Sequence, residues 1–211
     1  SSDLSIDGAK AALQMLTAEQ AQPYLEGAVA YAAGDVTNAL GKFRQVGASA
    51  DSGAAALAQG ACLVRLGQWQ EANDTLLKVY DQEPLLRHRA ATALALLFVR
   101  INQLDNALVW LDRAIEADPQ DPYAFYLRGH ALRRQGQLTP ANEALTTALR
   151  HRDDFVHAVA EMAALQARRA REGNGTEQAE ATVAARRYGE HAVDLAEAVG
   201  LPAVELHEAS G

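Results

Sequence analysis

A small residue returns four times along this chain at nearly constant intervals. The four alanines lie 33, 35 and 34 residues apart, and they are Ala39, Ala72, Ala107 and Ala141. Large apolar residues recur in step with them, at Phe43, Leu76, Leu111 and Leu145, as do turn residues at Gly34, Gly67, Asn102 and Gly136. Self-similarity near 34 residues, with helical spacing inside each period, indicates a repeat array whose units must stack to bury their apolar faces. We therefore expect an all-α fold, an α-solenoid of helix–turn–helix repeats.

The same spacing divides the chain into segments. It predicts four units over residues 20–52, 53–87, 88–121 and 122–155. Residues 1–19 are expected to form an N-terminal helix or cap, with the helix at about residues 7–16, and Thr17 and Gln20 have the spacing of a capping box. Residues 156–199 are expected to form a degenerate repeat of longer helices that caps the array, followed by a tail over residues 200–211.

Composition and charge exclude several classes of protein. The chain is 49% hydrophobic and 22% charged, so it can bury a core. Its net charge of −8 argues against nucleic acid as the main ligand, because phosphate neutralisation dominates that affinity. No apolar run of 18 residues predicts a membrane span. The single cysteine, Cys62, and the lack of a signal pattern favour the cytoplasm, or the periplasm if the chain is a processed or truncated form. Scarce lysine and abundant alanine are typical of a bacterial genome.

Two units carry the most complete pattern of large, small and turn residues. In the third unit these are Leu94, Ala95, Phe98, Ala107, Leu111, Ala114 and Pro119. In the fourth they are Phe125, Gly129, Leu132, Gly136, Ala141, Leu145 and Ala148. On these residues the chain resembles the tetratricopeptide repeat family over about residues 20–155, and more weakly over 156–199. The resemblance implies a right-handed superhelix whose concave face is lined by the first helix of each pair, and binding of peptides or partner proteins there instead of catalysis.

A row of arginines follows the repeat. Arg65, Arg100 and Arg134 each lie two residues before the turn of their unit, and Arg168 continues the spacing. Equivalent positions of stacked units lie side by side, so these guanidiniums, with Arg133 and His130, are expected to edge the groove and to bind carboxylates of an acidic peptide or a C-terminus. The alternative is that they are soluble helix ends that complement the helix dipole.

Apolar and aromatic residues on the first helices form a second candidate contact. The repeat phase directs Tyr24, Tyr31, Leu96 and Tyr126 towards the groove, where amphipathic rings are frequent interface anchors. The alternative is that some of them pack between helices and never meet solvent.

Motifs for catalysis or metal binding do not emerge. His151, Asp153, Asp154 and His157 have the composition of a metal cluster, but they cross a predicted helix boundary and are better explained as a cap followed by a solvated helix face. No phosphate loop or nucleophile elbow is present. We expect no enzyme activity, no cofactor and no metal.

The sequence therefore predicts a protein-interaction module, a scaffold or adaptor that holds a peptide or partner protein in its concave groove. Two alternatives stay open, a secretion-type chaperone for an export substrate and an assembly domain of a larger envelope or pilus protein.

Overall fold

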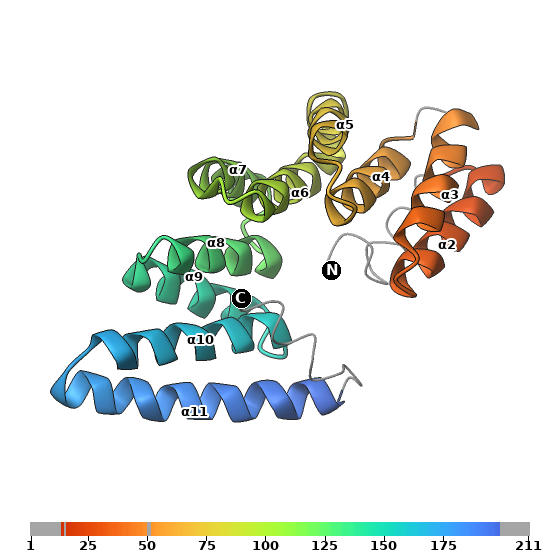
Figure 1. Ribbon diagram of the computed structural model, residues 1–211. Coiled ribbons are helices and arrows are strands. Elements are labelled where there is room, and N and C mark those ends of the chain that lie inside the picture. The colour runs from red at the N-terminus through yellow and green to blue at the C-terminus, as the bar shows by residue number, and fades with distance from the viewer. Residues whose placement is uncertain (1–13, 15, 50–51, 199–211) are drawn as a thin grey trace. The chain divides into compact units, whose positions relative to one another are not determined.

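The computed structural model describes residues 14, 16–49 and 52–198, and this part of the chain is helical, without a strand (Figure 1). Its ten α-helices are α2 (Ala18–Ala32), α3 (Val36–Ser49), α4 (Gly53–Arg65), α5 (Trp69–Gln82), α6 (Arg87–Arg100), α7 (Leu104–Ala117), α8 (Pro122–Arg134), α9 (Leu138–His151), α10 (Val156–Glu172) and α11 (Gly175–Ala198). The all-α prediction is confirmed. The helix predicted near residues 7–16 and the tail lie almost wholly outside the described residues.

Consecutive helices pack as pairs, α2 with α3, α4 with α5, α6 with α7, α8 with α9 and α10 with α11. The sequence did not predict the short 3-10 helix at Pro84–Leu86, which follows α5. None of the described helices combines the length and the apolar character needed to cross a bilayer.

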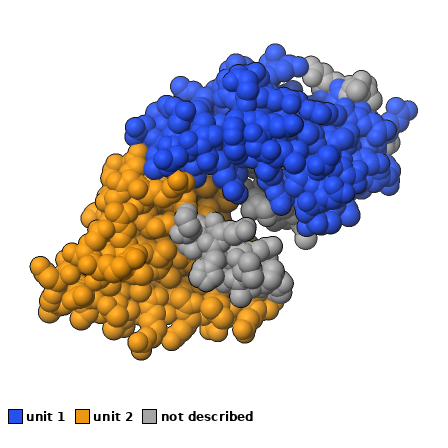
Figure 2. Space-filling model, in the orientation of Figure 1, with its two compact units in different colours: residues 1–119 blue, residues 120–211 orange. Residues whose placement is uncertain are grey.

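The chain divides into two compact units (Figure 2). Unit 1, residues 1–119, holds the first three helix pairs, and unit 2, residues 120–211, holds α8 to α11. The boundary falls in the loop between the third and fourth predicted repeats.

The first four helix pairs all turn in the same way. Their turn residues have positive φ angles of 84° at Gly34, 73° at Gly67, 60° at Asn102 and 81° at Gly136. In the first turn the Gly34 N–H donates to the Tyr31 carbonyl at 3.1 Å, and the Asp35 N–H donates to the Ala30 carbonyl at 2.9 Å. These two bonds form a Schellman motif, whose left-handed residue is usually glycine. The recurring glycine of the sequence is thus a helix stop.

The helices of a pair approach closely where the first helix carries a small residue. A Cβ atom on Gly60 would overlap Leu76 Cδ2, and one on Gly129 would lie 2.5 Å from Leu145 Cγ. Leu76 and Leu145 are fully buried. The small and large residues that recur along the sequence are therefore the two sides of one contact.

Replacing Gly60 with alanine should lower the free energy of unfolding by about 1–3 kcal/mol, because the new methyl group overpacks the buried Leu76. Gly41 is the matched control, since it is exposed inside α3 and a Cβ there meets nothing within 4 Å. Gly41→Ala should raise stability by about 0.5–1 kcal/mol through helix propensity. Urea unfolding of both variants measures the difference, and equal stabilisation by the two substitutions would contradict the packing described.

Candidate functional site

A cluster of rings lies on the first helices of unit 2. Tyr126 on α8 contacts Tyr123, Phe155 and His157, with ring centroids 5.6, 5.3 and 6.1 Å away. Tyr126 and Phe155 are buried, whereas Tyr123 and His157 are half-buried. The exposed Arg152 places its guanidinium carbon 5.2 Å from the Phe155 ring centroid. We call these five residues the ring cluster; its buried base and polar rim are the features of an interface anchor.

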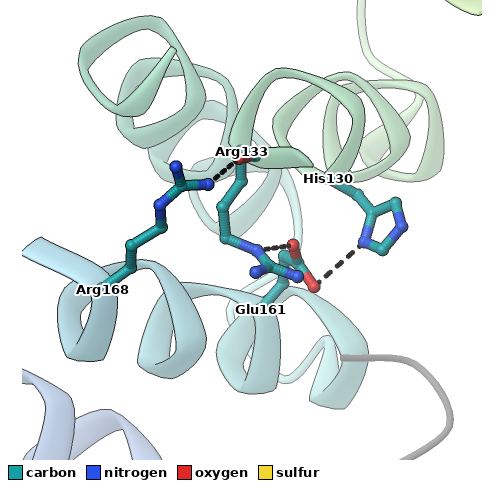
Figure 3. Close-up of polar contacts among 4 residues, drawn as sticks. All are labelled: His130, Arg133, Glu161 and Arg168. Carbon is teal, nitrogen blue, oxygen red and sulfur yellow. Dashed lines mark hydrogen bonds and ion pairs between the residues drawn. The ribbon is translucent and has the colours of Figure 1, made fainter. Parts of the chain in front are cut away.

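A buried acid connects α10 to α8 beside this cluster (Figure 3). Glu161 is 1% exposed; its Oε1 lies 2.5 Å from Arg133 Nε, and its Oε2 lies 3.1 Å from His130 Nδ1. Burial alone would raise the pKa of the Glu161 carboxyl, but the contacts with His130 and Arg133 hold that pKa below its ordinary value. The side chain is therefore a buried carboxylate that depends on two neighbours from the other helix.

The prediction that Arg133 and His130 join an accessible arginine row is wrong, because both turn towards Glu161 in the packed interior. The signal for this was present in the sequence. Glu161 stands at the repeat position that holds Ala58, Ala93 and Leu127 in the preceding units, and all three are 2% exposed. A charged residue at a covered position needs partners, and the adjacent first helix supplies them.

Two members of the arginine row cap the first helix of the preceding pair. Arg65 Nη1 donates to the Tyr31 carbonyl at 3.4 Å, and its guanidinium carbon lies 4.6 Å from the centroid of the Tyr31 ring. Arg168 Nη1 donates to the Arg133 carbonyl at 2.7 Å, and its Nε pairs with Glu172 (Figure 3). Both carbonyls belong to the last turn of a neighbouring first helix, so these two guanidiniums complement the dipole of that helix and not, as the helix-end alternative predicts, the end of their own helix.

The other two members of the row lie at equivalent positions and are exposed. Arg100 is the last residue of α6 and Arg134 is the last residue of α8. Leu96 lies one turn before Arg100 on α6 and is half-buried. A binding role for these three residues stays a prediction.

The predicted groove tyrosines are more buried than expected. Tyr24 is 2% exposed and packs on Phe43, with ring centroids 5.1 Å apart, so it belongs to the core and the expectation that it faces a groove is wrong. Tyr31 is also buried, and Arg65 covers its ring. Tyr126 forms the base of the ring cluster.

The histidines near residue 154 take part in ring contacts. His151 stacks on Phe125 with centroids 5.6 Å apart, and His157 lies against Tyr126 and Phe155. The pKa of His157 is lowered to about 4; burial is the largest cause, and the positive charge of Arg152 acts in the same direction. Within residues 14, 16–49 and 52–198, no three histidine, cysteine or acidic side chains gather as metal ligands.

Comparison with known proteins gives a consistent result. Tetratricopeptide repeat models match residues 54–85 and residues 95–136. Among solved structures, the fold resembles TTC0263, described as a thermophilic TPR protein in Thermus thermophilus, with TM-score 0.71 and 19% identity over 90% of this chain and 98% of that one. It also resembles MamA 41-end from Desulfovibrio magneticus RS-1, with TM-score 0.58 and 19% identity over 86% and 96% of the two chains. No curated protein sequence matches significantly. At these identities the structural likenesses establish the fold.

Replacing Glu161 with glutamine should lower the free energy of unfolding by about 3–5 kcal/mol, because it removes the carboxylate charge from a buried ion pair with Arg133. A Glu161→Leu/Arg133→Leu double variant is the control, and it should lose less than the single variant because both charges of the pair are removed together. Urea unfolding at neutral pH measures both. A double variant that loses as much stability as Glu161→Gln, or more, would contradict the pairing.

The same pair predicts an acid-sensitive stability. The pKa of Glu161 is lowered in the folded state, so the stabilisation is fully present above the ordinary carboxyl value of 4.5 and is lost as the pH falls through the lower folded pKa. Stability measured by urea unfolding below about pH 5 should therefore fall more steeply with acid for the wild type than for Glu161→Gln. Parallel acid dependence of the two proteins would contradict the assignment.

Proposed function

The chain is a tetratricopeptide repeat protein, and from that premise we propose that it is a non-catalytic scaffold that binds a protein partner on the first-helix face of its repeats. The observation that carries the proposal is the ring cluster of unit 2. Its five residues come from α8, from α10 and from the loop before α10, so the face of the first helices gathers large amphipathic side chains at one place. None of the rings in the cluster comes from a second helix of unit 2.

Partner binding at this cluster would use its half-buried rim. Tyr123 and His157 are half-buried, and the exposed Arg152, whose Nε pairs with Asp154, places a charged guanidinium beside the Phe155 ring. Tyrosine and arginine dominate the binding energy of many interfaces, because they bury large area while keeping a hydrogen-bonding group. The buried Glu161 pair fixes α8 against α10 and so preorganises the rings.

We also propose that the partner segment is acidic. Arg100 and Arg134 end the first helices of their pairs and are exposed, and Arg152 is exposed beside the ring cluster. Guanidinium groups pair with carboxylates in a bidentate geometry, which favours aspartate, glutamate or a free C-terminus in the ligand. Cytoplasmic location, inferred from the single cysteine, is part of the same proposal.

The experiment begins with capture of the partner by the immobilised chain and mapping of its bound segment by cross-linking and mass spectrometry. A synthetic peptide of that segment is then titrated by calorimetry. Arg100→Ala/Arg134→Ala should weaken binding by at least about a hundredfold, because each charged hydrogen bond contributes roughly 1.5–3 kcal/mol. The affinity should also fall with added salt, since exposed charges are screened within about 8 Å at physiological ionic strength.

The matched control is Arg150→Ala/Arg187→Ala, which removes the same charge from the exposed faces of the second helices α9 and α11. It should bind the peptide as the wild type does. Equal weakening by the two double variants would show that Arg100 and Arg134 affect binding only through the net charge of the chain. Unchanged affinity after Tyr123→Ala would remove the ring cluster from the proposed site.

A further inference from the structure

The first helix of unit 1 leaves uncovered a face that is covered in every later repeat. Leu25 and Val29 on α2 are 39% and 70% exposed. The residues at the equivalent positions of α4, α6 and α8 are at most 2% exposed, and they are Ala58, Cys62, Ala93, Leu97, Leu127 and Ala131. The exposure of two large aliphatic side chains at these positions is therefore specific to α2 among the described helices.

Within each unit both helices of the preceding pair contribute to covering the next first helix, and the first helices also pack on one another, α4 against α6 and α8 against α10. Within the two units, α3 packs on α4, α5 on α6 and α9 on α10. Polar contacts fix two of these seams: Gln59 Nε2 donates to the Phe43 carbonyl at 3.0 Å, and Gln166 Nε2 donates to Asn142 Oδ1 at 3.0 Å. No described helix takes this place on α2.

A shallow groove of about 580 Å³ lies on the uncovered face. Its apolar floor comes from Leu25 and Val29 on α2 and from Ala33 just after it. Its polar residues come from both helices and the turn between them, and they include Glu26 of α2, which pairs with Lys42 of α3. The groove thus presents to solvent an apolar strip of the kind that the preceding helix pair covers elsewhere in the chain.

We propose that a second copy of this chain supplies the missing helix, its α11 docking in the groove between α2 and α3. α11 is the second helix of the last pair, the same role that α3, α5 and α9 hold in theirs. It is 24 residues long and carries the exposed aliphatic residues Val183 and Val193, at 70% and 48%. One copy therefore offers the helix that the other copy lacks.

Complementary charges on α11 and on the groove wall support this placement of α11 in the groove. Inside unit 1, Arg44 lies five residues after the buried Ala39 of α3 and pairs with Glu71 near the start of α5. On α11, the exposed Arg186 lies five residues after the buried Ala181. In the same arrangement, Arg186 of one copy would lie near the start of α3 in the next copy.

An exposed acid lies at that point. Asp35 precedes α3, and its carboxylate accepts the Asn38 N–H at 3.2 Å, which fixes the acid at the groove wall. The contact joins two different faces, so it is heterologous and extends head to tail. It is separate from the ring cluster and does not depend on the proposed function.

Sedimentation velocity of the full chain over a range of concentrations tests this inference. The wild type should form species larger than the monomer that grow with concentration. Val29→Glu and Val193→Glu each place a charge on one of the two faces, and each should weaken self-association at least about a hundredfold. Val109→Glu is the control, because this valine is exposed on α7 and lies on neither face; it should assemble as the wild type does.

Mixing the two defective variants gives the decisive observation. Each retains one intact face, so an equimolar mixture of Val29→Glu and Val193→Glu should form a one-to-one complex that neither forms alone. A wild type that stays monomeric at all concentrations would overturn the inference. If Val29→Glu also destabilised that monomer, the groove would be covered by residues of the same chain. Assembly that the mixture fails to restore would also overturn it, since the contact would then not be head to tail.

Discussion

The fold depends on a helix pair in which the first helix has almost no side chain at the crossing point. Gly27, Gly60 and Gly129 let the second helix approach so closely that the ring of Phe43 or a buried leucine fills the space a methyl group would occupy. The two helices of a pair therefore lie close together, and the faces that they turn away from each other are still apolar. Stacking follows from this, because a pair that cannot bury those faces alone is stable only when the next pair covers them.

Stacking also determines where side chains remain available. Within each unit, the second helix of one pair packs on the first helix of the next, which leaves the opposite face of that first helix exposed; Leu25 and Val29 on α2 are also exposed. In unit 2 the ring cluster lies on this exposed face of the first helices. The buried Glu161 carboxylate, at a position that is apolar in the preceding repeats, holds α8 against α10 beside the cluster. Arg133 and His130 are taken into the interior by Glu161, so the charge available for binding is smaller than the number of arginines suggests.

The helices, their pairing and their turns could be predicted from the sequence, because a 34-residue period, left-handed turn residues and small residues at crossings are local signals. The contacts and burial of individual side chains could not be predicted in this way. Tyr24 has the repeat phase of a groove residue, yet it is buried and packs on Phe43, the ring that lies against Gly27. The spacing predicts the arginine row, but spacing alone does not distinguish a guanidinium that donates to a neighbouring carbonyl from one that faces water. The uncovered Leu25 and Val29 become visible only when the burial of each repeat is compared.

At one repeated position, Arg65 and Arg168 bond to carbonyls at the end of a neighbouring first helix, whereas Arg100 ends α6 as an exposed side chain. The most direct measurement of this difference is the free energy of unfolding of Arg65→Met, Arg168→Met and Arg100→Met, since methionine keeps much of the apolar stem and removes the donor. The first two should each lose about 1 kcal/mol, the typical net contribution of a hydrogen bond. Arg100→Met should stay within about 0.5 kcal/mol of the wild type, as exposed substitutions do. Equal losses at all three positions would show that the whole row is structural and would contradict the account.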